Sequence, residues 1–417
     1  MGKAARFSNG WSWKAGRHTI DWHLSSGPEL NCNFDGSYVG QIFRGVKFRS
    51  RRDWCSEEMG LRSMVVKAAI SGTGVRLPVN RSFERELAQL EALTGRVPDA
   101  VGVDRVRRAL ESENNYLVAK AANLAAAHEL AGLLPQVLAA FDRFFADPVK
   151  SDPQCWAKNA LVKALVKLEC RDATVYLRGL RHTQEEPVWG GQSDTAGALR
   201  STCTLALVAC EGLSETALLN ILLEPLLDQD KSVRMEAARA IGQVGGASAA
   251  LLLKLRVLLR KEEPEVLGAC FSALLTMEHT DKPGTISLVA DFLDDGEEAA
   301  AEAAFSLAET HEPSALAALI ERRQRVSDTW FGSVLDHAIV LTRLREGMDF
   351  LLGVIERDVR QAASALEAIS RVYNSAEVRA RVAESVARSK SERVALAFRQ
   401  FFPELSLQAS MEPGVGR

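Results

Sequence analysis

The sequence of 417 residues lacks most of the motifs by which an enzyme or a metalloprotein is recognised. It has no CxxC pair, no HExxH motif and no local cluster of histidines with carboxylates, so it offers no compact metal-binding motif. No apolar run reaches the roughly 18 residues that span a bilayer. The N-terminus shows no secretory signal pattern. We therefore expect a cytoplasmic protein with no membrane segment, no metal and no cofactor.

Disulfide-forming cysteines and aromatic residues are also scarce. The seven cysteines are odd in number and show no framework of short spacings. Most lie in apolar segments, which predicts small buried side chains in a reducing compartment. Cys203 and Cys210 are two helical turns apart, so a ligand pair is the alternative interpretation. Aromatic residues make up only 6% of the chain, whereas Ala and Leu dominate from about residue 85, a bias that favours helix over sheet.

The net charge of −3 is unevenly distributed along the chain. Residues 1–55 carry nine Lys or Arg against four Asp or Glu, a balance of +5, which leaves 42 against 50, or −8, for residues 56–417. In a mildly acidic body, a phosphate-binding surface has to be a local patch. This balance favours a protein partner over nucleic acid.

Residues 1–63 differ from the rest of the chain. They hold four of the seven Trp and show no sustained helical or alternating period. We expect an irregular extension, either disordered or the result of a translation start assigned upstream of Met59 or Met64. The alternative is an arm that binds a nucleic-acid strand, because basic and aromatic residues interleave in Phe43–Trp54.

Helical periodicity begins near Phe83, where Phe83, Leu87, Leu90 and Leu93 form one apolar stripe. We assign residues 64–103 to a linker and a capping helix, 104–401 to an array of repeats, and 402–417 to a disordered tail. Eight segments share small residues in the middle turn, and they start at residues 117, 156, 199, 233, 266, 299, 333 and 359. A second helical segment follows nearly every one. The sequence thus predicts about eight antiparallel helix pairs.

Residues 233–259 show why one pair is not stable alone. Val233, Ala237, Ala240, Ile241 and Val244 form one stripe of the first helix, with alanines that permit close approach of another helix. The second helix is apolar on two faces, with Leu253 and Val257 opposite a larger set: Leu251, Leu252, Leu255, Leu258 and Leu259. We expect neighbouring repeats to cover both faces.

Turn residues agree with these boundaries. Pro153, Pro264 and Pro313 stand where helices are expected to begin, since the first helical position tolerates proline. Asp152 is a candidate N-cap, and Gly245–Gly246 is a candidate C-terminal stop.

The segment 228–246 resembles the HEAT repeat, in particular the bacterial variety named after phycobilisome lyases. The matching residues are Asp230, Val233, Arg234, Ala237, Ala238, Ala240, Ile241 and Gly242. The clear match covers about residues 228–310, and the remainder follows by period. The resemblance implies an all-α, right-handed α-solenoid of HEAT or armadillo type, with a concave surface lined by the second helices. It implies little about activity.

Three enzyme classes with related folds serve as alternatives. HEAT-type deoxyhypusine hydroxylases hold two iron ions with recurrent His-Glu pairs. This chain has His128-Glu129 and His311-Glu312, but Met235 occupies the matching place in the best repeat. HEAT-like DNA glycosylases have a basic concave face, for which the candidates are Lys254, Arg256, Arg260, Lys261, Arg322, Arg323 and Arg325 beside Trp330. Bilin lyases need a tetrapyrrole pocket, to which residues 291–298 would contribute carboxylates.

The most distinctive local feature is the stretch Arg181–Gly197, which lengthens one repeat and places Trp189 beside two glycines. Long loops in tight arrays often carry binding. The alternative is that Trp189 fills a gap between repeats. We therefore expect a non-catalytic scaffold or adaptor that binds another protein along its concave face and has no small-molecule substrate. The expected partner-binding residues are Trp189, Arg256, Arg260, Arg322 and Arg323.

Overall fold

The computed structural model describes residues 10–15, 18–24, 30–35, 47–48, 81–277, 281–373 and 375–403. The chain divides into two units, Met1–Arg81 and Ser82–Arg417. In the first unit, four strands pair antiparallel in sequence order: β1 (Gly10–Ala15), β2 (His18–Leu24), β3 (Leu30–Asp35) and β4 (Lys47–Phe48). They lie in the extension for which we expected no regular structure. Most of the segment Phe43–Trp54 and the tail beyond residue 403 fall outside the described residues.

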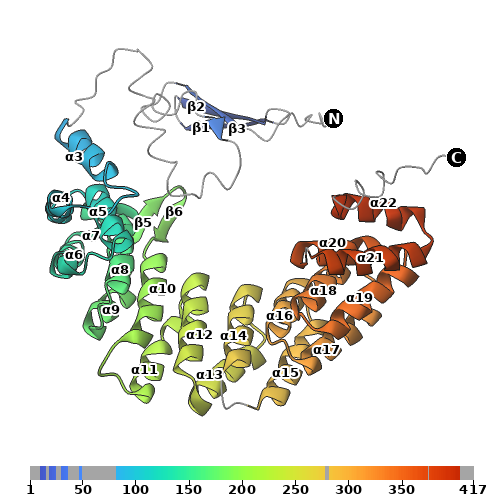
Figure 1. The fold of residues 1–417 in the computed structure, drawn as a ribbon. Helices are drawn as coiled ribbons and strands as arrows, with labels where there is room; N and C mark the ends of the chain where they lie inside the picture. Colours follow the sequence, from blue (N-terminus) through green and yellow to red (C-terminus); the bar gives the residue numbers. More distant parts are fainter. Residues whose placement is uncertain are drawn as a thin grey trace, which may run out of the picture. The chain divides into compact units, whose positions relative to one another are not determined.

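The second unit is built from α-helices (Figure 1). Two of them, α3 (Arg81–Glu91) and α4 (Ala100–Leu110), precede the repeats, and α22 (Glu392–Phe401) follows them. Eight helix pairs lie between: α5 (Asn115–Ala127) with α6 (Leu134–Arg143), α8 (Trp156–Lys167) with α9 (Ala173–Leu180), α10 (Gly197–Ala206) with α11 (Glu215–Leu222), α12 (Lys231–Val244) with α13 (Gly246–Leu258), α14 (Pro264–Thr276) with α15 (Lys282–Ala290), α16 (Glu297–Glu309) with α17 (Pro313–Arg325), α18 (Thr329–Leu341) with α19 (Arg345–Arg357), and α20 (Ala362–Val372) with α21 (Ala376–Ser389). A single turn, α7 (Pro148–Ser151), precedes α8. The prediction of an all-α solenoid of about eight pairs is confirmed.

Helix boundaries follow the turn residues. Helices α14 and α17 begin at Pro264 and Pro313, as predicted. The carboxylate of Asp230 accepts the backbone N–H of Ser232 and so caps α12. That helix ends where Gly245 adopts φ +73°, a conformation that residues with a Cβ atom rarely take.

The even-numbered helices form a continuous row. Each helix from α8 to α20 contacts the next even-numbered one, and this row lies on the inner side of the curve that α10–α20 describe in Figure 1. Small residues permit the close approach: a Cβ atom added to Gly242 of α12 would stand only 2.7 Å from the Cβ of Ala273 in α14. The expectation that the second helices line the concave surface is therefore wrong, because helices α11, α13, α15 and α17 lie on the outer side.

Helix α13 corrects a second expectation. Leu253 and Val257 are fully buried, as expected, but Leu251, Leu255 and Leu258 on the opposite face, which we also expected to be covered, are 68%, 60% and 60% exposed. Neighbouring repeats do not cover this face, since α13 packs on α12 and α14 and makes at most marginal contact with α11 and α15.

We predict that Gly242→Val destabilises the array, because the added side chain has to push α12 away from α14. Overpacking of this kind costs about 1–3 kcal/mol. The matched control is Gly132→Val, since a Cβ atom at Gly132 meets nothing within 4 Å. Thermal unfolding followed by circular dichroism should show a lower midpoint for Gly242→Val than for the control. Equal midpoints would show that α12 and α14 accommodate the larger side chain without being pushed apart.

Candidate partner-binding surface

The long loop between α9 and α10 folds into a β-hairpin. Strands β5 (Glu185–Val188) and β6 (Gly191–Asp194) pair antiparallel, with Val188 opposite Gly191. The intervening turn consists of Trp189 and Gly190, and Gly190 adopts φ +89°. Trp189 is 87% exposed, so it does not fill a gap between repeats. The hairpin instead presents an indole to solvent at its tip.

A buried carboxylate fixes the first strand of the hairpin to the array. Glu186 accepts hydrogen bonds from the backbone N–H of Gln154 at 2.6 Å, from Nε2 of Gln184 at 2.6 Å and from Oγ1 of Thr195 at 2.8 Å. Burial alone would raise the pKa of Glu186, but these hydrogen bonds and the nearby Lys158 outweigh it and hold the pKa below its usual value. Glu186 is therefore ionised at neutral pH.

Ion pairs fix the second strand. Asp194 accepts the backbone N–H groups of Gln184 and Ala196 and pairs with Arg200 of α10. Arg200 also donates from Nε and Nη2 to the two carboxylate oxygens of Asp228, at 2.8 and 2.9 Å. The Asp228 carboxylate lies just before α12. One guanidinium thus joins the hairpin, its own repeat and the following repeat.

The residues just before α8 form the part of the array to which the hairpin is hydrogen-bonded. Asp152 accepts the backbone N–H groups of Ala157 and Lys158, so its side chain caps α8, although Cys155 and not Asp152 occupies the N-cap position. Its carboxylate also lies 3.0 Å from Nζ of Lys158, and both side chains are fully buried. The intervening Gln154 and Cys155 adopt φ +57° and +54°. This strained turn aims the Gln154 N–H at Glu186.

We predict that the anchoring of the hairpin depends on pH through Glu186. Because its folded-state pKa is depressed, its contribution to stability is complete above the unfolded-state pKa of about 4.3 and is lost as the pH falls through the folded-state pKa. Thermal midpoints measured from about pH 6 to pH 3 should therefore depend less on pH in Glu186→Gln than in the wild type. Glu185→Gln, an exposed neighbour on the same strand, serves as the control. Parallel pH curves for wild type and Glu186→Gln would contradict the prediction.

The predicted partner-binding arginines of α13 and its end make ion pairs within the chain. Arg256 pairs with Glu262, a carboxylate that also accepts from Arg234 of α12. Arg260 pairs with Asp295 of the next repeat, and its guanidinium lies 4.2 Å from the ring centroid of Phe292. These two cations therefore link helices and repeats.

The arginines of α17 are engaged in the same way. Arg322 donates from Nε to the carbonyl oxygen of Leu293 at 2.9 Å and lies 3.0 Å from Asp294. Arg323 is only 3% exposed, and it donates to both oxygens of Asp336 at 2.6 and 3.1 Å. A buried side chain does not contact a partner, so the assignment of Arg323 to a binding surface is corrected to a structural role.

A pattern in the sequence links these pairs. Three ion pairs join residues about one repeat apart: Arg200 with Asp228 at a separation of 28 residues, Arg234 with Glu262 at 28, and Arg260 with Asp295 at 35. Charges that recur with the repeat period therefore indicate cross-links between repeats rather than a binding patch. The local density of arginines in the sequence does not reveal this spacing.

We predict that Arg323→Ala lowers stability by about 3–5 kcal/mol, because Asp336 is then left buried without its cation. The double variant Arg323→Leu with Asp336→Leu should recover much of this loss, since it removes both buried charges. Chemical denaturation measures the effect. Arg325→Ala, an exposed position at the end of the same helix, should change stability by no more than about 0.5 kcal/mol. A small effect for Arg323→Ala would show that the pair is not needed.

The residues weighed for enzyme chemistry occupy structural positions. His311 lies in the turn between α16 and α17 with Nδ1 3.0 Å from the carbonyl oxygen of Thr342, and Glu312 pairs with Lys282. Asp294 and Asp295, proposed as carboxylates of a lyase pocket, are engaged by Arg322 and Arg260. Within the described residues, no group of three or more His, Cys, Asp or Glu side chains is arranged to hold a metal ion. No helix of that part of the chain has the length and apolarity needed to cross a membrane.

The cysteines of the second unit are buried or half-buried thiols. Burial raises the pKa of Cys155 and Cys210 to about 11 and that of Cys270 to about 12. It also raises the pKa of Cys203. These thiols are protonated at neutral pH and are therefore poor nucleophiles and poor metal ligands.

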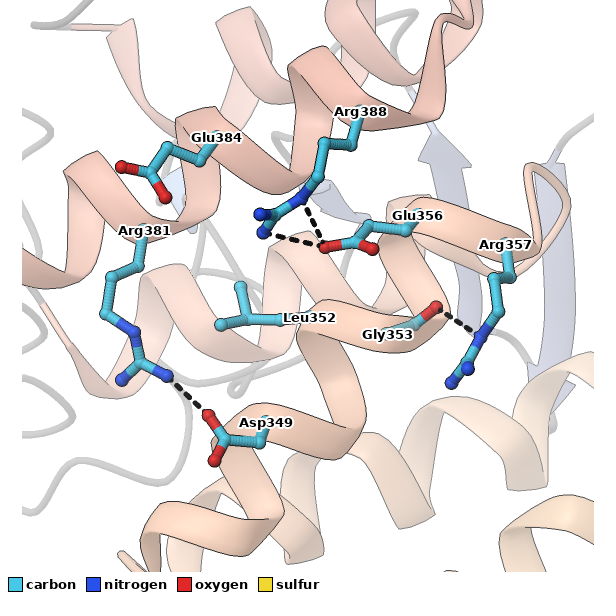
Figure 2. A pocket seen from close by; sticks show the side chains of 8 residues that line it. All are labelled: Asp349, Leu352, Gly353, Glu356, Arg357, Arg381, Glu384 and Arg388. Atoms are coloured by element: carbon cyan, nitrogen blue, oxygen red, sulfur yellow. Dashed lines mark hydrogen bonds and ion pairs between the residues drawn. The ribbon is translucent and has the colours of Figure 1, made fainter.

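A cavity of about 320 Å³ lies between α19 and α21. Figure 2 shows that its charged walls pair with each other: Arg381 points toward Asp349, and Arg388 lies 2.8 Å from Glu356. Arg357 donates to the carbonyl oxygen of Gly353 on its own helix. Because most of the charged side chains that line this cavity pair with one another, we interpret it as a packing gap between the outer helices α19 and α21.

Comparisons with known proteins give little further information. No family model matches the chain, and no curated protein matches it. Among solved structures, it is similar to human deoxyhypusine hydroxylase in complex with glycerol, with 17% identity and a TM-score of 0.25, over 64% of this chain and 92% of that chain. A likeness at this level does not bear on activity.

Proposed function

We propose that this chain is a non-catalytic scaffold of HEAT type that binds another protein, with Trp189 as an anchor. The observation that carries the proposal is the 87% exposure of Trp189 at the tip of a hairpin with a firmly held base. Tryptophan is enriched among the residues that dominate protein interfaces. A rigidly held hairpin favours binding because it loses little conformational entropy when the partner docks.

The charge around the hairpin favours a protein over nucleic acid. Residues 185–194 contain Glu185, Glu186 and Asp194 and no Lys or Arg. A phosphate backbone would be repelled by this segment. Four of the seven basic residues that are candidates for DNA binding, Arg256, Arg260, Arg322 and Arg323, are engaged with carboxylates of the chain itself.

We predict that Trp189→Ala loses the protein partner while keeping its stability. Affinity capture from a lysate of the source cells, quantified by mass spectrometry, should show proteins that the wild type retains and that Trp189→Ala loses by about tenfold or more. The matched control is Trp330→Ala, because Trp330 on α18 is also exposed, at 48%. Nuclease treatment of the lysate should leave the result unchanged.

Two results would count against the proposal. A clearly lower thermal midpoint for Trp189→Ala would assign the indole to packing, since exposed substitutions usually change stability by no more than about 0.5 kcal/mol. A salt-dependent mobility shift with duplex DNA, lost in Trp189→Ala, would favour the nucleic-acid alternative.

A further inference from the structure

The exposed face of α13 is a row of leucines. Leu251, Leu255 and Leu258 follow one another at spacings of four and three residues, so they lie along one side of the helix. They are exposed by 60% or more, and Leu259 beside them is 48% exposed. The opposite side of α13 holds the buried contacts with α12 and α14. Contiguous exposed apolar surface of this kind marks an interaction site.

The outer layer leaves space on both sides of this row. Helices α15, α17 and α19 each contact the next odd-numbered helix, but α13 makes at most marginal contact with α11 and α15. The row therefore faces solvent between two separated neighbours. A single α-helix, about 10 Å in diameter, fits such a site better than a broad protein surface does.

Two lysines lie on or just after α13 and make no ion pair with the described part of the chain. Lys254 lies between Leu251 and Leu255, and Lys261 follows the helix. Neither lysine makes an ion pair with the described part of the chain, because the nearby carboxylates Glu262 and Asp295 are engaged by arginines. The edge of the leucine row thus carries uncompensated positive charge.

We propose that α13 docks an amphipathic helix of a partner protein, with apolar residues spaced by three and four and with Asp or Glu beside them. The leucines would bury the apolar stripe, and Lys254 and Lys261 would pair with the flanking carboxylates. This surface is separate from the Trp189 hairpin and goes beyond the function proposed above. A chain with both surfaces is an adaptor that joins two proteins.

Two other occupants fit less well. A second copy of the chain would bring Lys254 toward its own equivalent. The leucine row is also only about 10 Å long, too small for the roughly 800 Å² that each partner buries in a stable interface. An anionic membrane is an extended surface that would meet more of the chain than these two lysines, and residues 56–417 carry 50 Asp or Glu against 42 Lys or Arg.

The test uses a fluorescein-labelled helical peptide of about 18 residues, with leucines spaced by three and four and glutamates on both flanks. A second peptide carries lysine in place of every glutamate. In fluorescence anisotropy with the full chain, the glutamate peptide should bind at least about tenfold more tightly than the lysine peptide. The variant Leu255→Ser with Leu258→Ser should weaken this binding by about tenfold or more. Lys254→Glu should shift the preference toward the lysine peptide.

Controls separate this surface from the hairpin and from loss of folding. Leu396→Ser removes another leucine that is 64% exposed, on α22, and should bind the glutamate peptide as the wild type does. Trp189→Ala should also bind it normally, so either surface can fail without the other. Circular dichroism checks that each variant is folded.

Several outcomes would overturn the proposal. These are no saturable binding of the glutamate peptide up to about 100 µM, or equal affinity for the two peptides. Flotation with vesicles of phosphatidylcholine and phosphatidylserine that depends on Leu255 and Leu258 would identify a membrane as the occupant. A dimer in sedimentation velocity that the same leucine variant abolishes would identify a second copy.

Discussion

The close packing of the even-numbered helices is the contact on which the rest of the second unit depends. Alanine and glycine bring the backbones together, as at Gly242 and Ala273, and this row is continuous from α8 to α20. A helix pair has too little surface to bury its own apolar residues, so the stability of each repeat comes from its neighbours. The tight inner row also sets the direction of the curve, because successive outer helices contact one another less closely than successive inner helices do.

Buried charges give the packing its register. Arg323 meets Asp336 in the following repeat and Gln361 in the one after it, and Arg200 meets Asp194 and Asp228. Apolar contacts tolerate small shifts of one helix along another, whereas a buried guanidinium requires its carboxylate at one distance and angle. The same device holds the hairpin, so its tip is presented in a defined place. The position of Trp189 therefore depends on the ion pairs at the base of the hairpin.

The sequence was sufficient for the array and insufficient for its surface. Period, small-residue pattern and turn residues predicted the helix pairs, the start of α14 at Pro264 and the end of α12 before Gly245. Each of these depends on neighbours in the chain. The exposure of Leu255 and the burial of Arg323 depend on how far apart successive repeats stand. The local periodicity of the sequence does not determine that distance. A leucine fits the apolar pattern of a helix equally well whether or not a neighbouring helix covers it.

The break in the outer row on both sides of α13 has a mechanical consequence. Bending the array changes the spacing of the outer helices more than that of the inner ones, because the inner row is held by close backbone contacts. Where outer helices already touch, as from α15 to α21, bending inward has to compress packed side chains. Around α13 such contact is at most marginal. The outer row therefore resists inward bending less at that repeat than it does between α15 and α21.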